Sequence, residues 1–466
     1  MVAYEPVGLC LIPLNIYLKG MKGFQGANRN QISLLPHDIN SWLPERHLAR
    51  FVVEITDRLD LTSIYKKYQG KGSMPYDPRL LVSLLFYGYS TGVYSSRKIE
   101  AATYDSVAFR FISGNQHPDH DTICTFRQRF LPQIQVFFKE ILLIGKELGL
   151  LKMGRIHIDG TKIQANASRH KAMSYEHMLK LEKQLEEEIA RLMELASAQD
   201  QKEATQELDI PEELGRRKER LERINEAKKV VESRAAERYK KEKEEYDQKM
   251  AARKEKQQKT GKNPQGKEPQ APDASPGMTD QYNFSDPESR IMKVSGGFNQ
   301  CYNAQAAVNA DMLIVGCYSN PHPNDKQELL PAIASVPGEL GAITHAVADT
   351  GYFSAENMVK SIEMGIDPFI AVKRENHNSF LERHLNPKTV MGPGTPVQTM
   401  QQKLDSKEGA AIYKMRKQTV EPVFGIIKEV LGFRRFLLRG EQNTDAEWGL
   451  VCLGYNLKRL FSLSMN

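Results

Sequence analysis

The sequence predicts an α/β domain that follows an all-α domain and is interrupted by a helical hairpin. Three observations lead to this prediction. Apolar residues recur at three-to-four spacing from about residue 35 to 150. A highly charged helical pattern fills residues 171–260. On either side of that stretch, strand-like apolar runs alternate with helical patterns. A chain of 466 residues is long enough for two or three such domains.

The all-α domain is expected over residues 35–150, after an N-terminal extension of residues 1–34. Pro78 can begin a buried helix, because its fixed φ suits the first helical position. Caps for two further helices are offered by Ser95 and Ser96 and by Asp119 or Asp121. Short helices with tight turns are typical of helix-turn-helix packing, although other all-α domains share the pattern.

Basic side chains of this domain could contact DNA phosphates. The expected contacts are Arg97, Lys98 and Arg127. The alternative is ordinary solvated charge on a small helical domain. The net charge of the whole chain, +6, permits a polyanionic partner and does not require one.

An antiparallel helical hairpin is expected over residues 171–260, followed by a flexible linker over residues 261–280. Its apolar stripes contain Leu181, Leu185, Ile189 and Leu192 in the first helix and Leu214, Leu221, Ile224 and Val231 in the second. The stretch holds 22 basic and 22 acidic residues, and this balance argues against an arm that grips DNA. We expect salt bridges between the two helices, and both a dimerisation role and a spacer role are compatible with the pattern.

Residues 151–170 and 281–431, on either side of the insertion, show the alternating α/β pattern. The expected strands cover residues 155–159, 301–308, 312–318, 343–349 and 368–372, and the expected helices cover 326–335, 355–364 and a long segment from about 407. The order is strand, strand, strand, helix, strand, helix, strand, helix, which is that of a ribonuclease H-like fold. Asn324 and Asp325 are interpreted as a helix cap, with a role in a site as the alternative. Residues 432–466 are expected to form a basic C-terminal helical tail.

Three carboxylates fall where this fold would bring them together. Asp159 is expected at the end of the first strand, Asp349 at the end of the fourth, and Glu421 on the last helix. Three converging carboxylates repel one another unless cations are present, and their oxygens suit Mg²⁺ or Mn²⁺. Two such ions, roughly 3.5–4 Å apart, can drive an in-line displacement at phosphorus. Taken singly, each residue could instead be a turn or surface carboxylate.

Other chemistries lack their sequence signals. The five cysteines are far apart and form no CxxC pair, so a zinc module or a disulfide framework is not expected. There is no phosphate-binding loop and no dinucleotide fingerprint, so no nucleotide cofactor is expected. The N-terminus is a poor signal peptide, and the longest apolar run, residues 80–87, is too short to span a bilayer. We expect a cytoplasmic protein that is nucleoid-associated when bound to DNA.

Several separate motifs occur in a fixed order along nearly the whole chain outside the hairpin. They cover residues 76–81, 87–92, 95–100, 117–122, 126–127, 158–162, 165–168, 286–290, 302–305, 348–352 and 420–425. These motifs resemble those of the bacterial insertion-sequence DDE transposases. The most diagnostic is Val-Glu-Pro-Val-Phe-Gly at 420–425, in which Glu421 precedes Lys428 by seven residues.

The resemblance implies a DNA transposase with Asp159, Asp349 and Glu421 as its metal ligands and catalytic residues, acting with two Mg²⁺ or Mn²⁺ ions. It implies double-stranded DNA as the partner, both as terminal inverted repeats and as target, and a homodimer in the DNA complex. The implied reaction is DNA cleavage followed by 3′-hydroxyl strand transfer. Two alternatives use the same residues: a ribonuclease H-like nuclease without strand transfer, and a catalytically dead element relic that only binds DNA.

Basic side chains near Glu421 and in the first aspartate motif are expected to hold DNA phosphates beside the metal site. They are Lys162, Arg416, Lys417, Lys428, Arg434 and Arg435. Tyr413 and Arg416 each lie one residue before the positions that Tyr and Arg occupy in related groups. Pro422 is expected to kink or restart the helix next to Glu421, because it lacks a backbone N–H.

Overall fold

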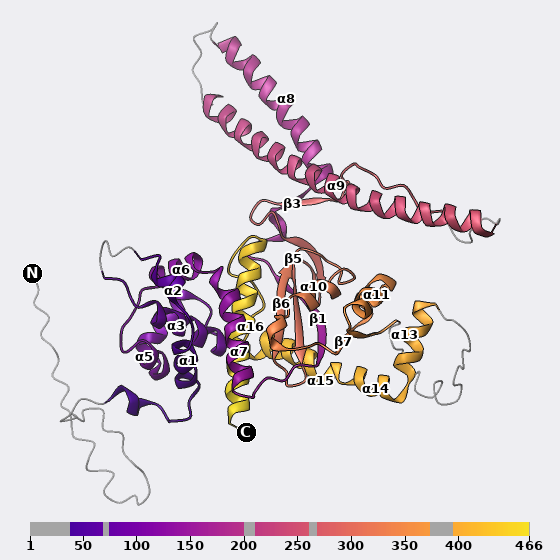
Figure 1. The fold of residues 1–466 in the computed structure, drawn as a ribbon. Helices are drawn as coiled ribbons and strands as arrows, with labels where there is room; N and C mark the ends of the chain where they lie inside the picture. The colour runs from indigo at the N-terminus through magenta and orange to yellow at the C-terminus, as the bar shows by residue number, and fades with distance from the viewer. Residues whose placement is uncertain (1–37, 69–73, 200–209, 261–267, 373–394, 466) are drawn as a thin grey trace, which may run out of the picture.

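The structure is a computed structural model that describes residues 38–68, 74–199, 210–260, 268–372 and 395–465 (Figure 1). The expected N-terminal extension, residues 1–34, lies outside the described residues, as do residues 261–267 of the expected linker. A helical N-terminal region, a mixed α/β sheet and two long projecting helices make up the described chain.

The N-terminal region is all-helical. Its elements are η2 (Ile39–Trp42), α1 (Leu48–Asp57), α2 (Thr62–Tyr65), α3 (Pro78–Thr91), α4 (Ser96–Asp105), α5 (Val107–Ile112), α6 (His120–Arg129) and α7 (Gln133–Glu147). Pro78 begins α3 as predicted, and most of α3 is buried. Asp119 caps α6 by accepting a hydrogen bond from the Thr122 N–H. Ser95 precedes α4 and makes no capping hydrogen bond through its side chain.

A six-stranded mixed sheet follows. Its strands are β1 (Arg155–Gln164), β4 (Arg290–Val294), β5 (Gly297–Asn309), β6 (Ile314–Asn320), β7 (His345–Ala348) and β8 (Asp367–Ile370). β5 pairs antiparallel with β1, β4 and β6, whereas β7 pairs parallel with both β1 and β8. The order β6-β5-β1-β7-β8 contains every strand that the sequence predicts, and β4 is an addition.

The first strand is longer than expected. Asp159 does not end β1, because β5 pairs with β1 from Ile156 as far as Gln164. The parallel neighbour β7 is shorter and pairs with β1 only up to Ile158. Asp159 therefore lies inside the strand, at the level where its parallel neighbour ends.

Helices cover the sheet and its edge. These are α10 (Leu329–Ala334), α11 (Ala355–Glu363), α13 (Pro396–Asp405), α14 (Lys407–Lys414) and α15 (Arg416–Gly425), with short 3-10 turns η4 (Gly338–Leu340) and η5 (Thr350–Tyr352). The long helix expected from residue 407 is thus divided at Met415. Pro422 lies inside α15 and does not interrupt it. The break at Met415 precedes Glu421 by about one and a half turns. A π-helical turn (Ile426–Val430) follows α15.

The last helix, α16 (Glu441–Ser464), lies within the segment expected to be a C-terminal helical tail and occupies the centre of the molecule. It lies between the N-terminal helices and the sheet, and packs against α3, α7 and β6 (Figure 1). A Cβ at Gly454 would come within 2.8 Å of the Tyr89 carbonyl carbon, so this glycine permits the close crossing of α3. The Trp448 Nε1–H donates to the Gln305 carbonyl at 2.9 Å.

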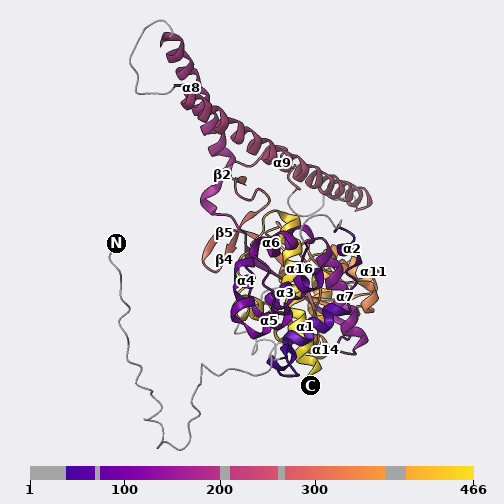
Figure 2. The same ribbon diagram turned by 90° about the vertical axis from the view of Figure 1, so that its left-hand side faces the viewer.

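The inserted region contains α8 (Tyr175–Gln199) and α9 (Ile210–Thr260), which project away from the rest of the chain (Figure 2). Two short strands, β2 (Ala172–Ser174) and β3 (Gln281–Asn283), pair at its base. Met178, Leu185, Ile224 and Val231 are among the residues of its small apolar core. Asp280, in the expected flexible linker, pairs with Arg238 of α9 at 3.2 Å, so this end of the segment is anchored.

Two ion pairs join α8 to α9, as the charge pattern predicts. Glu188 pairs with Arg217 at 2.8 Å, and Glu182 pairs with Lys228 at 2.7 Å, which gives an antiparallel arrangement. None of the helices in the described ranges is long and apolar enough to cross a membrane.

Candidate active site

Strand register brings two aspartates side by side. Ile158 of β1 is paired with Ala348 of the parallel strand β7. The residues that follow this pair, Asp159 and Asp349, are therefore neighbours at the same edge of the sheet. Asp349 caps the 3-10 turn η5, and its Oδ1 accepts from the Gly351 N–H at 2.8 Å. The Asp159 side chain is 17% exposed and that of Asp349 is 42% exposed, so both reach an edge that solvent can enter.

Arg416 gathers the third carboxylate to this edge. Its guanidinium lies 2.8 Å from Asp159 Oδ2, 3.1 Å from Glu421 Oε1 and 3.9 Å from Asp349 Oδ2. Arg416 is the first residue of α15, which packs against β1 and β5 and carries Glu421. The three carboxylates predicted from the sequence therefore converge on one cationic group.

Burial makes this cluster electrostatically sensitive. Desolvation raises the pKa of the Asp159 carboxyl to about 6, with Arg416 opposing the rise and Asp349 adding to it. Burial alone would lower the pKa of Arg416, but Asp159, Asp349, Tyr413 and Glu421 raise it above its ordinary value. Because the carboxylates repel one another, the cluster depends on a cation at its centre.

The carboxylate set fits a divalent ion in its chemistry. Oxygen ligands of this kind are those that Mg²⁺ and Mn²⁺ prefer, and the three side chains already share a cation, the guanidinium of Arg416. Across the described ranges, however, no three acidic, histidine or cysteine side chains are spaced to hold a metal ion. A divalent ion could bind between these carboxylates only after the guanidinium had moved.

Several of the predicted basic residues lie along β1 and the segment after α15. Lys428 Nζ donates to the Lys162 carbonyl at 3.1 Å, and burial lowers the pKa of Lys428. Arg435 Nη2 donates to Gln164 Oε1 at 3.2 Å, and Arg434 forms an ion pair with Glu429. Of the predicted residues, Lys417, Arg434 and Arg435 are exposed here, and Arg97 and Lys98 are exposed on α4 of the N-terminal region.

The predicted phosphate contact of Arg127 is wrong for this structure. Arg127 is only 5% exposed, and its Nη1 donates to the Tyr94 carbonyl at 3.0 Å and to Tyr89 Oη at 3.3 Å. The buried Glu447 carboxylate of α16 is 3.4 Å from the same tyrosine hydroxyl, and burial raises the pKa of Glu447 to about 7. Arg127 therefore belongs to a buried network that connects α6, α3 and α16, and helical periodicity could not reveal which face of α6 is covered.

Asp325 is a fourth carboxylate beside the cluster, and its interpretation as a helix cap is wrong. Helix α10 begins only at Leu329, and the Asp325 side chain caps no helix. Its Oδ1 accepts from Asn303 Nδ2 at 2.6 Å and from Gln305 Nε2 at 2.8 Å, both on β5. Asn303 and Gln305 are polar residues at alternate positions within the buried part of β5, and this was the signal in the sequence that could have revealed a polar site here.

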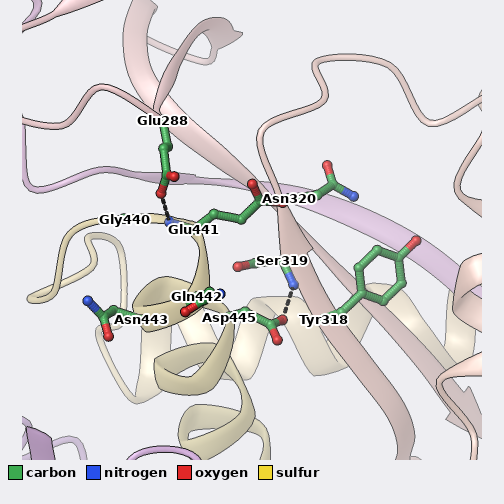
Figure 3. A pocket seen from close by; sticks show the side chains of 9 residues that line it. All are labelled: Glu288, Tyr318, Ser319, Asn320, Gly440, Glu441, Gln442, Asn443 and Asp445. Carbon is green, nitrogen blue, oxygen red and sulfur yellow. Dashed lines mark hydrogen bonds between the residues drawn. The ribbon is translucent and has the colours of Figure 1, made fainter. Parts of the chain in front are cut away.

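A separate cavity of about 730 Å³ lies at the start of α16 (Figure 3). It is lined by Glu288, Tyr318, Ser319, Asn320 and residues of the segment from Gly440 to Asp445. Figure 3 shows Asp445 accepting a hydrogen bond from the Ser319 N–H, at 2.7 Å. No predicted site residue lines this cavity.

Two family models match the chain. Residues 37–129 match the family described as Transposase domain (DUF772), and residues 388–461 match the family described as Transposase DDE domain. The first match covers the N-terminal helices from η2 to α6, and the second contains Arg416, Glu421 and Lys428. No curated protein and no solved structure matches the chain significantly. Both matches support the identification of the chain as an insertion-sequence DDE transposase.

Proposed function

We propose that this transposase binds the terminal inverted repeats of its element, cleaves the DNA there and joins the freed 3′-hydroxyl to target DNA. The observation that carries the proposal is the convergence of Asp159, Asp349 and Glu421 on a single cation at the edge of the sheet. The family described as Transposase DDE domain supports the same reaction class, because its match includes Glu421.

The fold supports this assignment. We propose that residues 151–170 and 281–431 form a ribonuclease H-like catalytic domain and that residues 35–150 bind DNA. In favour of this are the order β6-β5-β1-β7-β8, with antiparallel pairing up to β1 and parallel pairing beyond it, and the position of α15 over β1. Because strand transfer needs two DNA ends held together, we further propose a homodimer on DNA.

The site's own residues place the reactants. Asp159, Asp349 and Glu421 would hold two Mg²⁺ or Mn²⁺ ions, which when bound stabilise the attacking and leaving oxygens of the displacement. Arg416, once it leaves the carboxylates, would contact a DNA phosphate next to them. Lys162, Lys417, Lys428, Arg434 and Arg435 are proposed to extend this phosphate-binding surface.

The test is a DNA assay on the full chain. Purified protein is incubated with DNA that carries the element's ends, with Mg²⁺ or Mn²⁺, beside the Asp349→Ala variant. We expect metal-dependent cleavage and joining by the unmodified chain alone. Cleavage without joining would favour a nuclease, and binding without cleavage by both proteins would favour a DNA-binding relic; either result would contradict the proposal.

A further inference from the structure

Asp325 is held in place by donors from two strands. Its Oδ1 accepts from Asn303 Nδ2 and Gln305 Nε2 of β5, and Lys162 Nζ of β1 lies 3.4 Å from the same oxygen. Gln305 also accepts a hydrogen bond from Tyr352 Oη, in the turn that follows Asp349. One carboxylate oxygen is therefore saturated, and the hydrogen-bond network reaches the turn that positions Asp349.

The second oxygen of Asp325 lies near Gly351, in the 3-10 turn that Asp349 caps. No hydrogen bond engages Oδ2 from within the described residues. A Cβ built on Gly351 would lie 3.7 Å from this oxygen and 3.0 Å from Asp349 Oδ1. Asp325 and Asp349 thus flank the same glycine. Gly160 of β1 is also close to Asp325, since a Cβ there would lie 2.9 Å from Asp325 Oδ1.

An unpartnered buried oxygen lies in the same place. Asn303 is 0% exposed, and its Oδ1 has no hydrogen-bond partner among the residues described. It would lie 3.0 Å from a Cβ on Gly160, beside Asp325 Oδ1. Buried acceptors are almost always satisfied, so an orphan oxygen next to an open carboxylate points to a cation or donor that the chain does not supply.

We propose that Asp325 is a fourth carboxylate of the active site, which directs its Oδ2 toward the divalent ion held by Asp159 and Asp349. Asn303 and Gln305 fix its orientation, as outer partners do for metal ligands elsewhere. The inference rests on the proposed function, because it presupposes that the site takes a divalent ion. Gly160 is needed at this position, since a Cβ would come within 2.4 Å of Gln305 Nε2.

The test measures Mn²⁺ affinity of the full chain without DNA, from the free Mn²⁺ signal in electron paramagnetic resonance. The variants are Asp325→Asn, Asp349→Asn and Lys162→Met, with thermal unfolding as a check that each is folded. Asp325→Asn keeps an oxygen acceptor for the β5 amides and removes the charge. We expect it to weaken Mn²⁺ binding by roughly 10- to 100-fold, and Lys162→Met to leave the affinity unchanged or to raise it.

Two results would overturn the inference and leave the proposed function intact. The first is an unchanged Mn²⁺ affinity in Asp325→Asn while Asp349→Asn loses Mn²⁺ binding. The second is an equal loss of Mn²⁺ affinity in Lys162→Met, which would make Asp325 only a hydrogen-bond anchor. A different result would overturn the proposed function as well. This is the absence of Mn²⁺ binding by the unmodified chain, or binding that Asp349→Asn does not weaken.

Discussion

The candidate active-site edge and the projecting helices α8 and α9 both contain ion pairs, but the pairs differ in burial and in the balance of charge. In the hairpin, most ion pairs are exposed, such as that of Arg216 with Glu212 at 2.7 Å, and basic and acidic residues balance. At the site, one partly buried arginine faces three carboxylates that outnumber it. Exposed pairs contribute about 0–1 kcal/mol each, whereas breaking a buried pair by removing one partner costs far more.

The comparison shows that burial and the ratio of acidic to basic side chains decide what the same residue types do. The hairpin has no net charge, and its two helices are joined by a small apolar core and by ion pairs. The site has an excess of negative charge, and one guanidinium lies against all three carboxylates. Under the proposed function, this guanidinium is a counter-ion that a divalent ion would replace.

The largest effect is expected from Glu421→Gln, which keeps the shape of the side chain and removes its charge. If Glu421 holds an ion at the reacting phosphate, DNA cleavage should fall on the order of 10²- to 10³-fold, as for loss of other preorganised electrostatic groups. DNA binding, measured by fluorescence anisotropy, should change little. Glu429→Gln is the matched control, since Glu429 follows on the same segment and pairs only with Arg434 in the described structure; an equal loss in that variant would refute the assignment.

The second-largest effect is expected from Arg416→Gln. Among the described residues, only the Arg416 guanidinium contacts all three carboxylates. Removing it should destabilise the metal-free protein by roughly 1–3 kcal/mol, less than for a fully buried pair because two of the carboxylates are well exposed. Added Mn²⁺ should restore much of the lost stability. Thermal unfolding with and without Mn²⁺ measures both effects, and a variant as stable as the unmodified chain in metal-free buffer would show that the cluster needs no counter-ion.

The pH dependence should follow Asp159. Its pKa is raised from 3.8 to about 6, so folding favours the protonated carboxyl, and the stability it contributes is present below about pH 4 and lost as pH rises through 6. Holding a cation requires the ionised form, and a proton competes with the metal ion for Asp159, so cleavage at limiting metal concentration should fall as the pH drops below 6. A pH–rate profile tests this. A flat profile between pH 5 and 7 would contradict the assignment. Asp159→Asn should reduce the difference in stability between pH 4 and pH 7, and the buried Glu447 should account for part of what remains.

The smallest effects are expected in the hairpin. Arg216→Gln removes an exposed pair and should change the free energy of unfolding by less than about 0.5 kcal/mol. Lys228→Met removes the better-buried contact with Glu182 and should cost up to about 1 kcal/mol. Chemical denaturation of each variant provides the values. A loss from Arg216→Gln comparable to that from Arg416→Gln would remove the contrast between the two regions.

Sequence by itself determined the local features of this protein. Helical periodicity, the proline that begins α3 and the aspartate that caps α6 act over a few residues, so the helices of the N-terminal region and the two helices of the hairpin were predictable. The order of strands and helices along the chain was predictable from the same local signals. The motifs around Asp159, Asp349 and Glu421 indicated which element carries each of these residues. Local signals were least reliable at element ends: Asp159 was expected to end the first strand, although β5 pairs with β1 as far as Gln164.

Only the tertiary structure decided which side chains meet. Arg416 and Asp159 are 257 positions apart in sequence, and no local pattern records that their side chains lie 2.8 Å from each other. The same holds for the burial of Arg127 under α16 and for the position of Asp325 against β5. Partners of a charged group are set by the packing of distant elements, and that packing depends on burying apolar surface across the whole chain rather than on the residues next to the charge.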